Sequence, residues 1–258
     1  MAVGMFNVVF EWKKTITDGI VHLAFRKEDG SDFEFEPGQF ITFLFGEGKE
    51  LKRRSYSVAS LPESVGPIAT VKLIEIVVSY VPNGFASEIL FNLKPGDLLK
   101  AMGPVGRLVL KADEPKCQGA HPSRLIFIGT GTGIGPYRSM LPALLEQVKK
   151  RAGQHSVDII LGVRTQAEAM FKADFEAFAA QHPNFNFQVC YSREKAENLG
   201  KNEYLGYVQE SFSRLDLNSD QDIVYLCGNP HMIDESFEWL KEQGFEIGDV
   251  RREKYISS

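Results

Sequence analysis

The second half of the sequence alternates strand-like apolar runs with segments of helical spacing, and this alternation limits the possible folds most. Leu125–Gly129 is a buried-strand run, and Pro136–Lys150 follows it with apolar residues at helical spacing. Three more strand and helix pairs follow, at Val157–Val163 with Gln166–Gln181, Phe185–Tyr191 with Tyr207–Leu215, and Ile223–Cys227 with Pro230–Gln243. Such repetition predicts a parallel sheet covered on both faces, with ligands bound beyond the carboxyl ends of its strands.

The first half has a different rhythm, of short β-rich segments separated by turn residues such as Asp18-Gly19 and Pro37-Gly38. A helix is expected only at Gly84–Leu93. This pattern predicts an antiparallel β-barrel. The expected strands are Phe6–Trp12, Ile20–Phe25, Gln39–Phe45, Tyr56–Ala59, Val71–Ser79 and Leu98–Met102.

The change of rhythm predicts two domains. Between the two halves, residues 112–123 read ADEPKCQGAHPS, with prolines and no apolar periodicity. We expect a β-barrel domain over residues 1–112, a linker over 113–124 and a Rossmann-like α/β domain over 125–258. A length of 258 residues agrees with two domains of ordinary size.

Composition excludes several classes of protein. Apolar residues make up 43% of the chain and charged residues 24%, as in folded globular proteins. No apolar run approaches the roughly 20 residues of a membrane span, and the N-terminus lacks a secretory pattern, so we expect a cytoplasmic protein. The net charge of −5 argues against nucleic acid as a partner.

The chain has three cysteines, Cys117, Cys190 and Cys227, without Cys-x-x-Cys spacing. This count disfavours a disulfide framework and a structural zinc site, so we expect no metal. A plant-type [2Fe–2S] cluster needs four thiolates, so this chain cannot hold one alone.

A glycine-dense turn joins the strand at Leu125–Gly129 to the helix that starts at Pro136. Its glycines, Gly129, Gly131 and Gly133, would let the backbone approach a phosphate, and the free amides of the helix start favour an anion. A tight turn without a ligand explains the glycine spacing equally well.

Two motifs in the first half could also contact phosphate. In LKRRSYSVAS, Arg54 could bind a phosphate and Tyr56 could cover a flat ring, although an exposed basic strand explains the motif better on its own. In VVSYVPNGFASEIL, small residues from Gly84 to Ser87 begin a helix, where Ser87 is either an additional donor or an ordinary helix cap.

Together and in this order, these motifs resemble the ferredoxin–NADP reductase family over nearly the whole chain. The resemblance implies that Arg54 holds the FAD pyrophosphate, that Tyr56 lies against the isoalloxazine ring, and that Ser57 lies near flavin N5. Its further implied FAD contacts are Ser55, Ile76, Val77, Val78, Gly84, Phe85, Ala86, Ser87, Thr132 and Tyr255.

The same resemblance implies an NADP(H) site. Thr132 would touch both cofactors, and Cys227 would lie beside the nicotinamide, whereas without the resemblance Cys227 reads as a small buried apolar residue. The other implied NADP contacts are Gly131, Gly133, Pro136, Val163, Arg164, Ser192, Arg193, Tyr207, Gly228, Asn229, Pro230 and Met232.

The ends of two predicted strands bear on whether the nucleotide is NADP or NAD. Val163-Arg164 and Tyr191-Ser192-Arg193 carry arginine and hydroxyl donors, which suit a 2′-phosphate, and neither tip carries an acid. Tyr207 matches the family's adenine-covering tyrosine, but Leu205 replaces a lysine of plant-like members. A solvated basic rim is the competing interpretation for each arginine alone.

The C-terminal RREKYISS resembles the family's terminal Glu-x-Tyr through Glu253 and Tyr255. The resemblance implies catalytic roles for these two residues, Ser57 and Cys227, with Tyr255 stacked on the flavin. Three residues follow Tyr255, unlike in plant-like members, and an ordinary terminal edge strand remains open.

The implied function is FAD-dependent electron transfer between NADPH and a separate carrier, ferredoxin or flavodoxin, by a monomer. Lys49, Lys52 and Arg53 could steer an acidic carrier, or could belong to a solvated loop. The alternatives are a free-flavin reductase, an oxygenase reductase subunit, and a non-catalytic nucleotide-binding regulatory subunit.

Overall fold

The computed structural model describes residues 3–63, 66–111, 123–150, 155–195, 197 and 199–255. The chain divides into two compact units. The first unit contains residues up to Leu110 together with Gly135–Ala143, and the second contains Lys111–Ile134 and Leu144–Ile256. Residues 113–122 of the expected linker, with Cys117, lie outside the described residues, whereas Ser123 and Arg124 already belong to a strand.

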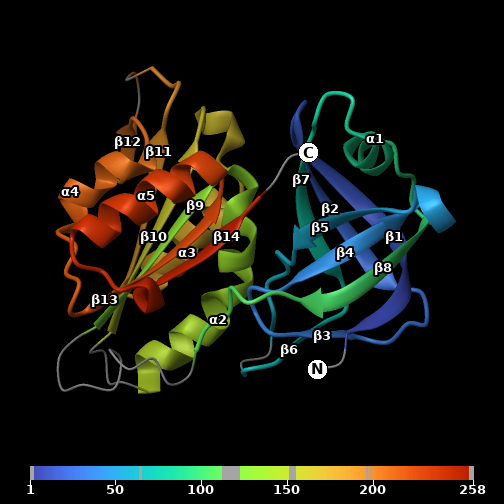
Figure 1. The fold of residues 1–258 in the computed structure, drawn as a ribbon, viewed down its shortest axis with the longest axis horizontal. Coiled ribbons are helices and arrows are strands. Elements are labelled where there is room, and N and C mark those ends of the chain that lie inside the picture. The colour runs from blue at the N-terminus through green and yellow to red at the C-terminus, as the bar shows by residue number, and fades with distance from the viewer. Residues whose placement is uncertain are drawn as a thin grey trace. The chain divides into compact units, whose positions relative to one another are not determined.

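The first unit is a curled antiparallel sheet, as the sequence predicts (Figure 1). Its six strands lie in the order β5-β4-β8-β1-β2-β7, and β3 pairs with β6 beside them. Among the described residues of this unit, α1 (Phe85–Phe91) is the one α-helix that lies wholly within it. The strands are β1 (Gly4–Thr17), β2 (Ile20–Lys27), β3 (Phe33–Phe35), β4 (Phe40–Phe45), β5 (Lys52–Ser57), β6 (Ala69–Val71), β7 (Ile74–Ser79) and β8 (Leu98–Val105).

Aromatic side chains form much of the core of this unit. The ring of Phe25 lies between those of Phe10 and Phe43, with centroid distances of 5.4 and 5.1 Å. All three side chains are buried. Burial on this scale provides the main driving force for closing the sheet over its core.

Two expected strands of this unit differ from those observed. The strand expected at Tyr56–Ala59 begins earlier, because Lys52 already pairs with Phe45 in β4. The strand expected at Val71–Ser79 is two strands, β6 and β7, which pair with different partners, β3 and β2.

The second unit is a parallel sheet with helices packed on its faces, as predicted (Figure 1). Its strand order is β12-β11-β10-β9-β13-β14. The strands are β9 (Ser123–Thr130), β10 (His155–Val163), β11 (Phe185–Tyr191), β12 (Glu203–Leu205), β13 (Asp222–Gly228) and β14 (Val250–Lys254). Among the described residues, its α-helices are α2 (Gly135–Lys150, from Leu144 onwards), α3 (Lys172–Gln181), α4 (Phe212–Leu215) and α5 (Pro230–Glu242).

Strand alternation divides the buried side chains between the two faces. On one face, Phe187 of β11 stacks on Phe175 of α3 at 5.1 Å. On the other face, Ile126 and Val224 belong to a core cluster that includes Phe212 of α4 and Ile233 of α5. Burial on both faces explains why these strands are nearly continuous apolar runs.

Two expected helices are interrupted. Gln166–Gln181 is a 3-10 turn, η4 (Gln166–Glu168), followed by α3, because Phe171 adopts a left-handed backbone with φ 58°. Tyr207–Leu215 divides into a 3-10 turn, η5 (Val208–Ser211), and α4. Among the described residues, no helix has the length and apolar character required to cross a membrane.

We predict that Phe25→Ala lowers the free energy of unfolding of the first unit by about 3–5 kcal/mol, because the cavity cannot be refilled inside the aromatic cluster. Trp12 and Trp239 are the two tryptophans of the chain, so a Trp239→Phe background leaves Trp12 as the fluorescence reporter of this unit in urea titrations. The control Leu98→Ala truncates a side chain that is 56% exposed, and should cost less than about 0.5 kcal/mol. Equal losses for both variants would contradict the role given to the cluster.

Candidate functional site

The loop after β9 and the end of β13 touch where the strand order reverses. A Cβ on Gly133 would lie 2.4 Å from the carbonyl oxygen of Cys227, and one on Gly228 would lie 2.5 Å from that of Thr130. The backbone N–H of Asn229 donates to Thr130 Oγ1 at 2.9 Å. Only residues without a side chain allow this approach, which brings the glycine-dense turn and the Cys227-Gly228-Asn229 turn together at the position where α/β sheets bind ligands.

Several residues around this turn that were predicted to contact the nucleotide instead stabilise the protein itself. The Asn229 side chain caps α5 by accepting from the backbone N–H groups of His231 and Met232. Met232 lies in the core, and Pro136 is also buried. Backbone groups of Gly131 and Thr132 could therefore contact a ligand here, because Gly131 has open space beside its Cα.

Cys227 lies beside the C-terminal strand. It is opposite Glu253 in the β13–β14 register, and the backbone N–H of Tyr255 donates to the carbonyl oxygen of Gly228 at 2.8 Å. Burial raises the pKa of the Cys227 thiol well above its usual range, Glu253 raises it further, and a hydrogen bond with the Tyr255 side chain opposes them. The sulfur is therefore a neutral thiol, which suits a steric role rather than nucleophilic attack.

The ends of β10 and β11 bring three predicted phosphate contacts together. The backbone N–H of Ser192 donates to the carbonyl oxygen of Val163 at 2.9 Å, and that of Arg193 donates to Arg164 at 2.8 Å. Arg164, Ser192 and Arg193 thus occupy neighbouring strand tips, while the Val163 side chain is buried. Tyr207 is 64% exposed, which leaves its ring available for stacking.

In the first unit, the motif around Arg54 meets the start of α1. The Arg54 guanidinium lies 4.9 Å from the centroid of Phe85, the first residue of α1, and Lys52 Nζ lies 4.4 Å from the same centroid. A cationic side chain beside the unsatisfied amides of a helix start is an arrangement that suits phosphate. The structure thus brings together two motifs that lie about thirty residues apart in the sequence.

Tyr56 and Ser57 lie on opposite faces of β5. Burial raises the pKa of Tyr56 to about 12, against the opposing effect of Arg54. Its ring lies 5.8 Å from Phe43, and it remains partly exposed. Ser57 is buried, and Ser55 shares a hydrogen bond with Thr42 at 2.9 Å. Tyr56 is consequently a neutral ring at the edge of the core that can cover a flat ligand.

The turn before α1 is held by Ser87. Its hydroxyl accepts from the N–H of Val81 at 3.1 Å and lies 2.9 Å from the carbonyl oxygen of Gly84. A Cβ on Gly84 would lie 2.8 Å from the carbonyl oxygen of Val81. The hydroxyl therefore shapes the loop, and the backbone amides at Phe85 and Ala86 are the groups of this helix start that could donate to an anion.

The strand that carries Ile76, Val77 and Val78 lies at the end of its sheet. In the strand order of the described residues, β7 has β2 as its single neighbour. All three side chains are buried, and Glu75 on the outer edge of β7 bonds with Ala59 and Ser60, so a ligand could meet this strand at the backbone edge beyond Glu75.

Sequence reasoning missed a charged cluster beside these strands. Glu75 Oε2 lies 2.9 Å from His22 Nε2 and 2.8 Å from Arg138 Nη1, and Arg138 also donates to the carbonyl oxygen of Ala59 at 2.6 Å. Burial raises the pKa of Glu75, but the His22 and Arg138 hydrogen bonds outweigh it, so the pKa is lowered. The sequence signal that could have indicated this cluster is an acidic residue inside the apolar run Ile74–Ser79.

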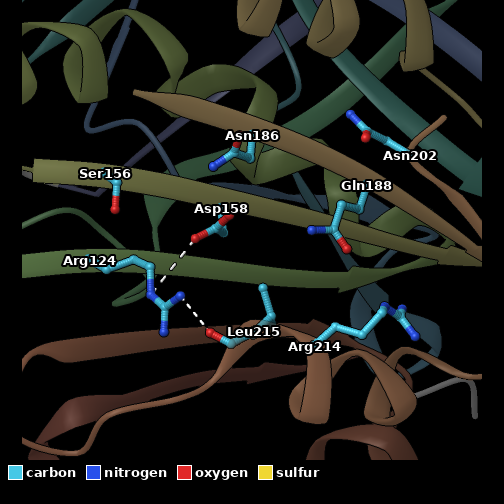
Figure 2. Close-up of a pocket in the computed structure, with 8 residues that line it drawn as sticks. All are labelled: Arg124, Ser156, Asp158, Asn186, Gln188, Asn202, Arg214 and Leu215. Carbon is cyan, nitrogen blue, oxygen red and sulfur yellow. Dashed lines mark hydrogen bonds and ion pairs between the residues drawn. The ribbon is translucent and has the colours of Figure 1, made fainter. Parts of the chain in front are cut away.

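A polar pocket of about 280 Å³ lies on the second unit, lined by residues of β9, β10 and β11, by Asn202 before β12 and by α4 (Figure 2). Its lining residues are Arg124, Ser156, Asp158, Asn186, Gln188, Asn202, Arg214 and Leu215. Arg124 donates to Asp222 at 2.6 Å and to the carbonyl oxygen of Leu215 at 2.6 Å. Its guanidinium thus joins strands to α4 and has a structural role.

The two units therefore fit the two cofactors that the motifs imply. The first offers a cation, helix-start amides, a neutral aromatic ring and a strand edge, which together match a flavin dinucleotide. The second offers a glycine cradle and arginine-bearing strand tips, which match a nicotinamide dinucleotide.

Comparisons with known proteins agree with this division. Residues 8–110 match the family model of an oxidoreductase FAD-binding domain, and residues 127–236 match that of an oxidoreductase NAD-binding domain. Ferredoxin–NADP reductase B of Sorangium cellulosum is 32% identical over 90% of this chain and 90% of its own length.

Two further matches extend the comparison. The toluate 1,2-dioxygenase electron transfer component of Pseudomonas putida is 26% identical over 95% of this chain, which spans 66% of that protein. A crystal structure of a ferredoxin NADP+ reductase from Neisseria gonorrhoeae with bound FAD and NADP has a TM-score of 0.75 at 21% identity, covering 97% of this chain and 98% of that one.

We predict that Cys190 and Cys227 resist alkylation by iodoacetamide at pH 8 in the native protein. Burial raises the pKa of Cys190 to about 11 and that of Cys227 well above its usual range, so the thiolate fraction is small at this pH. Peptide mass spectrometry before and after unfolding in urea measures the modification. Labelling of native Cys227 as fast as in urea would show that the site exposes a reactive thiolate.

Proposed function

Because the chain belongs to the ferredoxin–NADP reductase family, we propose that it transfers electrons between NADPH and a separate one-electron carrier, ferredoxin or flavodoxin. The family makes it an oxidoreductase with an FAD-binding and a NAD(P)-binding domain. Bound FAD supplies the exchange between a hydride from NADPH and single electrons for the carrier.

The observation that carries the nucleotide assignment is the pairing of strand tips at Arg164 and Ser192-Arg193. Backbone hydrogen bonds fix these residues side by side, and a guanidinium with a hydroxyl suits a phosphate. In the proposed complex, Arg193 and Ser192 bind the 2′-phosphate of NADPH, Tyr207 covers the adenine, and the loop Gly131–Gly133 holds the pyrophosphate.

In the first unit, Arg54 and the α1 amides bind the FAD pyrophosphate, while Tyr56 and the β7 edge orient the flavin ring. Ser57 would lie near flavin N5. In the second unit, Cys227 would exclude water beside the nicotinamide as a neutral thiol, and Glu253 and Tyr255 would contact the redox cofactors. Binding and orientation are the main contributions of the protein, because the cofactors carry the redox chemistry.

The composition of these 258 residues and the names of the relatives support a separate carrier. The 258 residues contain three cysteines, fewer than a plant-type [2Fe–2S] cluster requires. The side chains of Lys49, Lys52 and Arg53 are exposed next to the Arg54 motif and could attract an acidic carrier. Glu47 and Glu50 lie in the same loop, so a solvated mixed-charge loop is the competing interpretation.

A second candidate function is the reductase component of an oxygenase. The match of 26% identity to a dioxygenase electron transfer component spans nearly the whole chain and supports it. In that case the electron acceptor would be an oxygenase partner rather than a general carrier.

The carrier function is tested by stopped-flow reduction with NADPH, with purified ferredoxin, flavodoxin and free flavin as acceptors. We expect fast reduction of one carrier protein, with free flavin much slower. Turnover with free flavin alone would exclude the carrier function. A purified chain that stays colourless after addition of FAD would exclude every flavin-dependent function.

We predict that Arg193→Ala raises the dissociation constant of NADPH by about 10- to 100-fold and leaves that of NADH within about threefold. The variant loses a charge-assisted contact to the 2′-phosphate, and such contacts contribute about 1.5–3 kcal/mol. Fluorescence titration of the flavin-loaded protein measures both constants. Lys195→Ala, which removes another exposed cation nearby, is the control, and equal losses for NADPH and NADH in Arg193→Ala would refute the assignment.

A further inference from the structure

The two arginines at the strand tips have different surroundings. Glu168 binds Arg164 with both carboxylate oxygens: Oε2 accepts from the backbone N–H of Arg164 at 3.1 Å, and Oε1 forms an ion pair with Nη2. Among the described residues, the side chain of Arg193 has no ion-pair partner. One cation of the pair is therefore already neutralised.

Glu168 is held firmly in this position. Its backbone N–H donates to the carbonyl oxygen of Thr165 at 3.1 Å within η4, and its side chain is 12% exposed, whereas that of Arg164 is 57% exposed. The carboxylate therefore stays with the guanidinium, while the guanidinium faces solvent. The ion pair favours the charged form of Arg164 and raises its pKa.

This contact affects how a phosphate can bind. A guanidinium binds a phosphate through paired N–H groups, and a carboxylate on the same group uses donors that the phosphate would need. The negative charge of the carboxylate also repels a phosphate at the same strand tip. Removing the charge should thus strengthen phosphate binding at this tip.

We propose that Glu168 is a specificity-determining residue that limits discrimination between nucleotides with and without a 2′-phosphate, by neutralising Arg164. This inference rests on the proposed nucleotide site at Arg164, Ser192 and Arg193. Arg193 and Ser192 then provide most of the preference for the phosphate, and Arg164 adds little while Glu168 is ionised.

The test is calorimetric titration of the full chain with 2′,5′-ADP and with 5′-AMP at low ionic strength, which needs no turnover. The measured quantity is the ratio of the two affinities. Glu168→Gln keeps the side-chain volume and an oxygen acceptor for the Arg164 N–H but removes the charge. We expect it to raise the ratio by about three- to tenfold, with binding of 5′-AMP unchanged.

Two further variants separate this mechanism from a general charge effect. Glu176→Gln removes an equal charge from α3, where Glu176 lies 3.5 Å from Lys172, and should leave the ratio within about twofold of the original chain. In Arg164→Ala/Glu168→Gln, the gain should disappear, because it depends on the freed guanidinium. A gain that persists without Arg164 would overturn the neutralisation mechanism.

The outcomes also distinguish this inference from the proposed function. If the original chain prefers 2′,5′-ADP and Glu168→Gln leaves the ratio unchanged or lowers it, the inference fails and the NADPH site stands. If the original chain binds 2′,5′-ADP and 5′-AMP equally but Glu168→Gln prefers 2′,5′-ADP, the proposed NADPH preference is refuted and the inference is supported. Absence of binding by every variant would refute both.

Arg164→Ala in the original chain gives an independent measurement if Glu168→Gln does not fold. A loss of less than about threefold in the ratio would support neutralisation of Arg164. A loss of tenfold or more would show that Arg164 is fully available to the phosphate, and would overturn the inference.

Discussion

The close approach of two backbone turns in the second unit is the constraint on which its site depends. A single extra carbon at Gly133 or Gly228 would overlap a backbone carbonyl oxygen of the opposite turn. Without this contact, the loop after β9 could not lie against the end of β13, and Thr130 could not accept from Asn229. The glycines thus determine the separation of the two turns as well as their flexibility.

The main architecture was predictable from the sequence, because it arises from a periodic pattern of apolar residues. Buried parallel strands need apolar side chains on both faces, and these runs stand out between amphipathic helices. The short strands β12 and β14 carry no such signal, because each is defined by pairing with a longer neighbour. The interruption at Phe171 was also not predictable, since the apolar spacing continues through a residue whose backbone turns left-handed.

The location of the candidate site was more predictable than the state of its side chains. Residues that follow parallel strands must meet at one edge of the sheet, so Arg164 and Arg193 were expected to be neighbours. The hydrogen bonds that occupy Asn229 and Ser87 depend on exact local geometry, as does the ion pair of Arg164 with Glu168. The cluster of His22, Glu75 and Arg138 joins residues far apart in sequence, so no local pattern indicates it.

The hydrogen bond from the backbone N–H of Tyr255 to the carbonyl oxygen of Gly228 acts on the main chain of Tyr255 and not on its side chain. It anchors the main chain of Tyr255 to the turn after β13, whereas the position of the aromatic ring is set by the rotation about its own side-chain bonds. A change in the direction of this ring therefore needs a different rotamer, not a displacement of the peptide segment that carries it. Side-chain rotation of this kind is a smaller and more local motion than the movement of a loop or terminus.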